Sequence, residues 1–221
     1  MNRRELLDDL TGRIVRIRSD HPVRVAIDGV DASGKTTLAN ELVSPIEAMG
    51  RPVIRASIDR FHNPSHIRRS RGDRSAEGYF RDSFDYDGLA EALLHPLGQA
   101  GSRRFKRAIF DFQSDSAIDA RVEEAPPDSV LLFDGVFLLR PELRHYWDLS
   151  IFVRADFATT VGRAEIRDAD LFGSRAAVRQ RYEERYVPGQ QLYLSEATPE
   201  QYASVVVDNN DPARPTLVAP P

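Results

Sequence analysis

The chain has 221 residues, of which 41% are hydrophobic and 29% charged, and its formal net charge is −4. This size and composition are typical of a soluble globular protein, and we expect a single domain over residues 1–221. The negative balance argues against general binding to nucleic acid, and the longest apolar run, residues 130–139, is too short to cross a membrane. The absence of cysteine excludes disulfides and thiolate metal sites and fits a cytoplasmic location.

The first part of the chain is predicted to form a helix, a strand, a second helix and a second strand. Apolar residues at helical spacing indicate an N-terminal unit, residues 1–20, with its helix over residues 3–18. An apolar strand over 23–28 precedes a glycine-containing loop, a helix over 35–49 and a strand over 53–58. This βαβ unit predicts parallel strands.

Two segments in the middle of the chain, residues 60–84 and 101–116, are expected to be insertions on the substrate side of the sheet. The run from Asp59 to Phe84 is polar and rich in arginine, so it is either a solvated loop or a mobile flap over a substrate, and the sequence leaves both readings open. A helix is predicted over residues 86–99 and a strand over residues 105–112.

Nearly continuous apolar runs predict two buried strands further on, over residues 129–135 and 149–153. The remaining predicted elements are helices over residues 156–170 and 175–187, a short strand over residues 204–208 and a frayed tail over residues 213–221. The order of these elements predicts an α/β fold in which helices cover both faces of a parallel sheet.

Residues 29–36 match G-x-x-x-x-G-K-[ST], the pattern of a phosphate-binding P-loop, in the strand–loop–helix context that it requires. Glycines let backbone N–H groups turn toward a phosphate, and the following helix N-terminus adds partial positive charge. Lys35 is expected to neutralise the β- and γ-phosphates of ATP, with GTP as the alternative donor, and Thr36 to offer its hydroxyl to Mg²⁺. The expected nucleotide-binding residues are Gly29, Asp31, Ala32, Ser33, Gly34, Lys35, Thr36 and Thr37.

Two aspartates follow predicted strands at the edge of the sheet where the phosphate loop lies. Asp59 comes directly after the second strand, where it could deprotonate a hydroxyl beside the γ-phosphate. Asp134 ends the strand over residues 129–135, where a carboxylate can hold Mg²⁺ directly or through water. A turn or helix-capping role remains the alternative for each.

Arginines recur at helical spacing in residues 156–187. Arg163 and Arg167 are four residues apart and share one helix face, and Arg175 and Arg179 repeat the spacing on the next helix. These faces are either solvated or form a lid that stabilises transition-state charge and excludes water, with Arg163 and Arg167 as the catalytic candidates.

Taken in order, these pieces resemble the uridine kinase and phosphoribulokinase-like family of P-loop kinases over residues 23–211. Besides the loop, residues 58–62 are similar to that family's Asp-x-Phe-Tyr, and residues 83–87 to its Asn-Phe-Asp-His-Pro-Asp. Residues 110–112 are similar to Tyr-Asp-Phe, and residues 133–136 to Glu-Gly-Ile.

The resemblance implies roles that the spacing alone does not assign. It makes Asp59 the catalytic base and gives Asp85 the ribose hydroxyls of a nucleoside. The side chains that it implies around the acceptor are Phe84, Phe110, Phe112 and His62.

The chain departs from that family in two places. Uridine kinases carry a pyrimidine-reading histidine three residues after Tyr-Asp-Phe, where this chain has Asp115, and an ionised aspartate only accepts hydrogen bonds. Two lid arginines of the family are Ala164 and Phe172 here, and either Arg175 or Arg179 could replace them. Asp115 is therefore a candidate acceptor-side residue with altered chemistry.

The expected function is phosphorylation of a small-molecule alcohol by Mg-ATP, most simply at the 5′-hydroxyl of a ribonucleoside such as uridine or cytidine. Three alternatives stay open: a kinase for a pantothenate-, glycerate- or phosphoribulose-like acceptor, a regulatory NTP-binding protein, and a kinase-like protein that only binds its ligands. The guanine-reading Asn-Lys-x-Asp segment of NTP switches is absent. The expected partner is the small acceptor, with neither nucleic acid nor membrane, and a homo-oligomer is left open.

Overall fold

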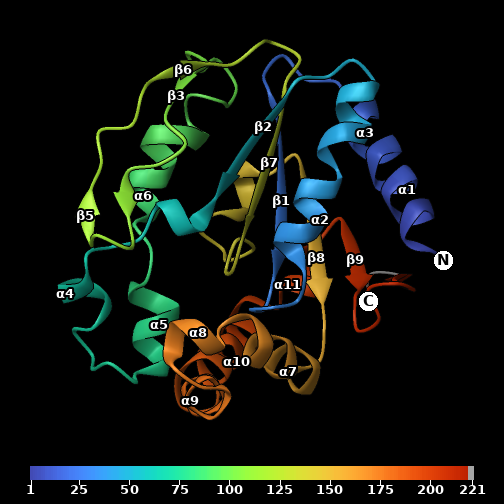
Figure 1. Ribbon diagram of the computed structural model, residues 1–221. Coiled ribbons are helices and arrows are strands. Elements are labelled where there is room, and N and C mark those ends of the chain that lie inside the picture. Colours follow the sequence, from blue (N-terminus) through green and yellow to red (C-terminus); the bar gives the residue numbers. More distant parts are fainter. Residues whose placement is uncertain (219–221) are drawn as a thin grey trace.

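The computed structural model describes residues 1–218, and at its centre lies a six-stranded sheet in the order β10-β9-β8-β1-β7-β2 (Figure 1). β1 is paired in parallel with β7 and β8, β7 with β2, and β8 with β9. The strands are β1 (Val23–Gly29), β2 (Val53–Ser57), β7 (Val130–Gly135), β8 (Leu149–Arg154) and β9 (Val205–Asp208). The predicted α/β fold, a mainly parallel sheet covered by helices, is confirmed.

The end of the described chain differs from the prediction of a frayed tail over residues 213–221. Thr216–Val218 form β10, which pairs antiparallel with β9 and extends the edge of the sheet. Leu217 packs against the core on one face of the sheet and Val218 against the core on the other. Burial of these two apolar side chains stabilises the pairing of β10 with β9. Residues 219–221 lie outside the described part of the chain.

One face of the sheet is covered by α1 (Arg3–Arg16), α2 (Lys35–Glu41) and α3 (Val43–Ala48). Successive side chains of a strand point to opposite faces, so Val25 and Ile27 of β1 share this core with the three helices. Figure 1 shows the three helices together on one side of β1.

The helix predicted over residues 35–49 is interrupted at Leu42. Pro45 has no N–H to donate to the carbonyl of Glu41, so the α-helical hydrogen-bond ladder cannot pass through this point unbroken.

The opposite face is covered by α5 (Ala76–Asp82), α6 (Tyr86–Leu89), a π-helical turn (Ala90–Leu94) and α10 (Val187–Ala197). Their apolar side chains pack with Ala26, the β1 residue that points away from Val25 and Ile27, and with the aromatic rings of this layer. Alternation along a single strand therefore builds two separate cores, one on each face.

The polar segment before Phe84 forms short helices instead of a structureless loop, and several of its residues line a cavity beside the phosphate loop. It contains a 3₁₀ turn (Ile58–Arg60), α4 (Ser65–Arg68) and α5. The Ser75 hydroxyl caps α5 by accepting the Gly78 N–H at 2.9 Å, and α5 buries Tyr79 and Phe80. The capping serine and the buried aromatic pair outweigh the polar composition of the segment.

The strand predicted over residues 105–112 is wrong, because the chain changes partners within it. β3 (Arg104–Phe105) pairs with β6 (Glu123–Glu124), and β4 (Phe110–Asp111) pairs with β5 (Ser116–Ala117). Between them the N–H groups of Lys106 and Ile109 donate to the carbonyls of Ala92 and Arg60 instead of to a neighbouring strand.

The predicted helical region after β8 has more pieces than expected. The first predicted helix divides into α7 (Phe157–Arg167) and α8 (Ala169–Phe172), and the second runs on past residue 187 into α10. Pro188 lies in the first turn of α10, where its missing N–H matters less than in the middle of a helix. The remaining elements are α9 (Arg175–Arg181), a π-helical turn (Tyr182–Tyr186), α11 (Pro199–Tyr202) and a 3₁₀ turn (Arg144–Tyr146).

Helices α7 to α10 lie beyond the carboxyl ends of β1 and β8, at the bottom of the view in Figure 1, with α5 beside them. Among residues 1–218, none of the helices combines the length and apolar character that crossing a bilayer would need.

Candidate active site

The backbone conformation of the phosphate loop is fixed by close contacts. Gly34 has a φ of 101°, and a Cβ on it would lie 2.5 Å from Nδ2 of Asn209, so a larger residue would be both strained and blocked. That same amide donates to the carbonyl of Ser33 at 2.7 Å, and Nζ of Lys35 donates to the carbonyl of Val30 at 3.0 Å. The loop shape that the sequence motif predicts is thus fixed by contacts from Asn209, directly after β9, and from its own lysine.

Thr36 and Asp134, the two predicted Mg²⁺ ligands, are brought together. The Thr36 hydroxyl donates to Oδ2 of Asp134 at 2.5 Å, and Nη2 of Arg55 lies 2.8 Å from Oδ1 of the same carboxylate. Within residues 1–218 no group of three or more His, Asp or Glu side chains could hold a metal by itself. A hydroxyl and one carboxylate nevertheless fit Mg²⁺, which usually keeps several waters and takes phosphate oxygens as ligands.

A cavity of about 540 Å³ lies beside the phosphate loop. Its walls combine the loop with α7 and the segment after β9, and we call it the nucleotide-side cavity. It is lined by Arg3, Ala32, Gly34, Lys35, Thr36, Thr37, Glu41, Arg163, Arg167, Asn209 and Pro212.

A second cavity of about 630 Å³ borders the loop at Asp31 and Thr36, and we call it the acceptor-side cavity. Its walls are formed largely by aromatic rings and carboxylates from the segment after β2, from α5, from the segment at β4 and from the helices after β8. Thr36 and Arg167 line both cavities, so the two spaces meet at these side chains. The other lining residues are Asp31, Ser57, Asp59, Arg60, His62, Tyr79, Phe84, Asp111, Phe112, Gln113, Val136, Asp168, Leu171, Phe172, Tyr182 and Tyr186.

Asp59 lies in the acceptor-side cavity, at the first turn after β2. Solvent reaches it through the cavity mouth, but the surrounding walls reduce its hydration and raise its pKa above the ordinary 3.8. The charge of Lys35 opposes this rise, while the carboxylates of Asp31 and Asp134 add to it. A carboxyl group with a raised pKa beside the phosphate loop is a suitable proton acceptor for a hydroxyl.

His62 lies between two aromatic rings of the acceptor-side cavity, with ring centroids 4.6 Å from Phe84 and 4.7 Å from Phe112. Burial lowers its pKa to about 4, despite a hydrogen bond with the carbonyl of Asp59. The imidazole is therefore neutral near pH 7 and belongs to the aromatic wall.

Three residues that the resemblance places at the acceptor do not line this cavity. Asp85 caps α6 by accepting the Gly88 N–H at 2.8 Å, and Phe110 is buried in the core. Asp115 is turned toward α4, where it accepts the Ser65 N–H at 3.0 Å and pairs with Arg68 at 2.5 Å. These hydrogen bonds, led by those from Ser65, lower the pKa of Asp115.

Asp115 still reaches the cavity indirectly. Its partner Arg68 lies 4.4 Å above the ring of Phe112, which lines the acceptor side. The carboxylate therefore orients a guanidinium that covers one aromatic wall.

The two candidate catalytic arginines have different environments. Arg163 donates to four carbonyls, from Ala32, Ser33, Asn209 and Asn210, so it fastens the phosphate loop to the segment after β9. Arg167 is more exposed and lies where the cavities meet, held by Asp168 at 2.7 Å.

The two arginines expected to replace lost lid charges do not line either cavity. Arg179 pairs with Glu165 at 2.6 Å, which ties α9 to α7, and Arg175 lies exposed at the start of α9. Of the four arginines predicted to face the site from these helices, Arg167 is therefore the one that lines both cavities.

Several side chains of the site were not identified from the sequence. Arg55 is one of them. It could have been noticed because it is a charged residue in a strand whose alternate residues are apolar and buried. Tyr79, Tyr182 and Gln190 come from segments predicted as loop, helix surface or no element at all, and they reach the site only through tertiary packing.

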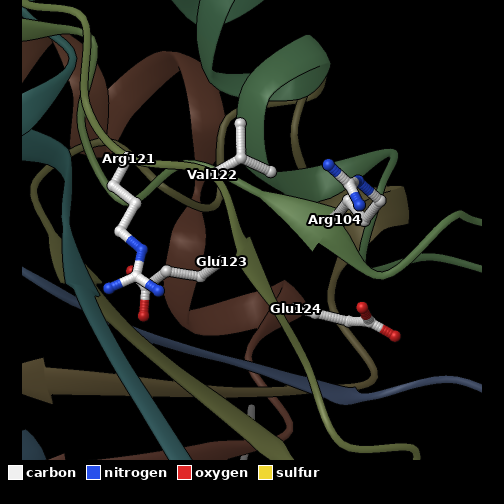
Figure 2. A pocket seen from close by; sticks show the side chains of 5 residues that line it. All are labelled: Arg104, Arg121, Val122, Glu123 and Glu124. Atoms are coloured by element: carbon white, nitrogen blue, oxygen red, sulfur yellow. The ribbon is translucent and has the colours of Figure 1, made fainter.

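A further hollow, of about 490 Å³, lies away from the phosphate loop at the hairpin of β3 and β6. Figure 2 shows its lining side chains, Arg104, Arg121, Val122, Glu123 and Glu124, on both strands and on the chain entering β6. None of the predicted site residues reaches it, so it does not belong to the candidate active site.

Comparisons with known proteins show what this chain is similar to. The model of the Phosphoribulokinase / Uridine kinase family matches residues 25–208. "Uridine-cytidine kinase B" of Dictyostelium discoideum is 29% identical over 182 residues, covering 80% of this chain and 71% of that protein.

Two solved structures have the same fold. A putative fructose transport system kinase from Silicibacter sp. TM1040 superposes with a TM-score of 0.74 at 25% identity, over 89% of this chain and 96% of that one. A possible uridine kinase from Bacillus stearothermophilus gives a TM-score of 0.72 at 22% identity, over 92% and 97% of the two chains.

Proposed function

Because the chain belongs to the Phosphoribulokinase / Uridine kinase family, we propose that it transfers the γ-phosphate of ATP to a hydroxyl of a small acceptor, and that this acceptor is a ribonucleoside. The observation that carries the proposal is the meeting of two cavities at Thr36 and Arg167, with Asp59 on the acceptor side. Phosphoryl transfer needs this arrangement of donor and acceptor on opposite sides of the transferred group.

In the proposed reaction the triphosphate lies along the backbone N–H groups of the phosphate loop, and Lys35 neutralises its β- and γ-phosphates. Arg163 keeps the loop in place through the four carbonyls that it contacts. Thr36 and Asp134 would hold Mg²⁺, which when bound neutralises charge on the phosphate oxygens.

Asp59 accepts the proton of the attacking hydroxyl as the oxygen approaches the γ-phosphate. Arg167, at the meeting point of the cavities, stabilises the charge on the equatorial oxygens of the transferred group. Its hydrogen bonds with Asp168 raise the pKa of its guanidinium and limit its orientations, so little reorganisation is needed during transfer.

The walls of the acceptor-side cavity support a nucleoside as the acceptor. Phe84, Phe112 and the neutral ring of His62 offer flat apolar surfaces on one side, and Tyr182 and Tyr186 offer others. Stacking on such rings stabilises a planar base with little dependence on its identity. Since Asp115 is turned toward Arg68, we propose that base recognition here depends on stacking more than on direct reading by residue 115.

The test is an acceptor panel with ATP and with GTP as donors, following ADP or GDP formation and identifying the product by mass spectrometry. Uridine and cytidine are expected to be phosphorylated faster than glycerate, pantothenate or ribulose 5-phosphate, with ATP preferred. Turnover of an anionic acceptor alone would contradict the nucleoside assignment and leave a kinase of another alcohol. Nucleotide binding without turnover of any acceptor would contradict the kinase assignment as a whole.

A further inference from the structure

Asp31 belongs to the phosphate loop by sequence, yet its side chain lies on the acceptor side. It lines the acceptor-side cavity together with Asp59 and Tyr79, and it does not line the nucleotide-side cavity. The carboxylate is therefore turned away from the space that we assign to the nucleotide.

Two buried side chains from the opposite face of the sheet fix the orientation of Asp31. Gln190 on α10 accepts the Asp31 N–H through Oε1 at 3.0 Å and donates through Nε2 to Oδ2 at 3.0 Å. The Tyr79 hydroxyl on α5 donates to the same Oδ2 at 2.6 Å. Both donors thus use one carboxylate oxygen, and Oδ1 has no hydrogen-bond partner within residues 1–218.

The helices that carry Tyr79 and Gln190 are packed closely enough to make this arrangement rigid. A Cβ on Gly189 would lie 2.7 Å from the carbonyl of Ala76 and 2.8 Å from the Tyr79 ring, so glycine permits the approach of α10 to α5. Tyr79 and Gln190 are 8% and 1% exposed. The free oxygen of Asp31 is therefore presented to the cavity in a fixed direction.

Within the described residues, Asp31 forms no ion pair with the cations that line the cavity. Its walls carry two guanidinium groups, of which Arg60 lies 3.9 Å from Asp111 and Arg167 lies 2.7 Å from Asp168. Over residues 1–218 neither Asp31 nor Asp59 has an ion-pair partner. The cavity is lined by four carboxylates and two guanidinium groups, so an acceptor that carried a carboxylate or a phosphate would meet an excess of negative charge, whereas an uncharged acceptor would not.

We propose that Asp31 is an acceptor-binding and specificity-determining residue, whose Oδ1 accepts a hydrogen bond from a second hydroxyl of an uncharged polyhydroxyl acceptor. This inference rests on the proposed function, because it assumes that the acceptor-side cavity holds the alcohol. Phosphate binding and acceptor selection are then joined on one loop, since the Asp31 backbone continues directly into the residues that hold the phosphates.

The experiment compares wild type with Asp31→Ala and Asp31→Asn, using uridine, 2′-deoxyuridine and 3′-deoxyuridine as acceptors. Asp31→Ala is expected to raise the KM for uridine by about 10- to 100-fold, the usual effect of losing a hydrogen bond to a charged group. The KM for Mg-ATP and its affinity measured by calorimetry are expected to stay within about 3-fold of wild type, because the side chain lies outside the nucleotide-side cavity.

Asp31→Asn keeps the packing and serves as the second variant. Its amide oxygen should take the place of Oδ2, where Tyr79 and Gln190 donate, which puts its NH₂ group in the cavity. We expect a smaller rise in the KM for uridine, because a hydroxyl can also accept a hydrogen bond, together with about 10-fold weaker discrimination against glycerate and pantothenate. Asp87→Asn, an exposed carboxylate outside both cavities, is the charge-matched control.

The deoxynucleosides identify the contact. If Asp31 binds a ribose hydroxyl, one of the two analogues loses affinity in wild type and shows no further loss in Asp31→Ala. An equal loss for uridine and both analogues overturns the inference, as does an unchanged KM for uridine in Asp31→Ala. Wild type that turns over no uncharged acceptor overturns the proposed nucleoside function first, and the inference with it.

Discussion

The two cavities that meet at Thr36 and Arg167 are assembled in different ways. The nucleotide-side cavity takes much of its wall from one stretch, residues 32–37, and the rest from α1, the end of α2, α7 and the segment after β9. The acceptor-side cavity draws one to three residues at a time from many segments spread between Asp31 and Tyr186. Phosphate binding can therefore be encoded in one loop, whereas the choice of acceptor depends on how the whole chain packs.

The largest effect should come from Asp59→Asn, which removes the proposed base and leaves the nucleotide-side cavity intact. We expect kcat to fall by about 10²- to 10⁴-fold, the usual contribution of a general base, with little change in Mg-ATP affinity. Steady-state kinetics and calorimetry measure the two quantities, and Asp87→Asn is again the control. Near-normal turnover in Asp59→Asn would contradict the proposal that the acceptor-side cavity supplies the base.

Arg167→Gln should have the next largest effect. Because Arg167 lines both cavities, its loss should lower kcat by about 10²-fold, as loss of a transition-state donor commonly does. The variant is measured with saturating ATP and uridine, so that binding defects do not contribute. A change confined to one KM would place Arg167 in a single cavity and contradict its position at the meeting point.

Arg163→Gln is the matched comparison on the same helix face. The substitution removes the guanidinium that donates to four carbonyls, so we expect a higher KM for ATP and a loss of about 1–3 kcal/mol in the free energy of unfolding. Chemical denaturation and steady-state kinetics measure both. If Arg163→Gln instead lowered kcat at saturating ATP as strongly as Arg167→Gln, the two arginines would share one role.

The pH dependence should separate the carboxylate of Asp59 from the imidazole of His62. Asp59 must be ionised to accept a proton, so kcat/KM for the acceptor should fall as pH decreases through its pKa, by about 10-fold per unit below it. Because reduced hydration raises that pKa, the fall should begin above the range of an ordinary aspartate. His62→Gln should show the same decrease of kcat/KM at low pH. If the decrease disappeared in that variant, it would be due to the histidine.

The smallest effect concerns the stability that His62 contributes. The pKa of His62 is lowered from 6.5 to about 4, so between these values the unfolded chain binds a proton that the folded chain does not. The free energy of unfolding therefore falls as pH falls below 6.5, and in His62→Gln the decrease between pH 7 and 5 should be smaller by about 1 kcal/mol, allowing for partial exposure. Urea denaturation at both pH values measures it; equal decreases would show that the ring titrates normally.

The contrast between the cavities also explains how much could be predicted from the sequence. Five strands and the phosphate loop follow from apolar runs and one motif, because burial and backbone geometry act over short stretches of chain. Asp59 and Asp134 were predicted near the loop since parallel strands end at the same edge of a sheet, and both lie there.

The acceptor side could be predicted only in part. Asp85 and Asp115 are polar residues near the right strands, but a capping bond to Gly88 and an ion pair with Arg68 direct them elsewhere. Tyr79 and Gln190 join the site through the packing of α5 on α10, a contact between segments that no local pattern relates. Local patterns specify which elements form, and tertiary contacts decide which side chains share a cavity.

A structure of the protein with Mg²⁺, a non-hydrolysable ATP analogue and uridine tests the central claim most directly. The account predicts the γ-phosphate between Thr36 and Arg167, and the 5′-hydroxyl of uridine within hydrogen-bond reach of Asp59, about 2.6–3.2 Å. Uridine bound outside the acceptor-side cavity, or with no hydroxyl within reach of Asp59, would contradict it.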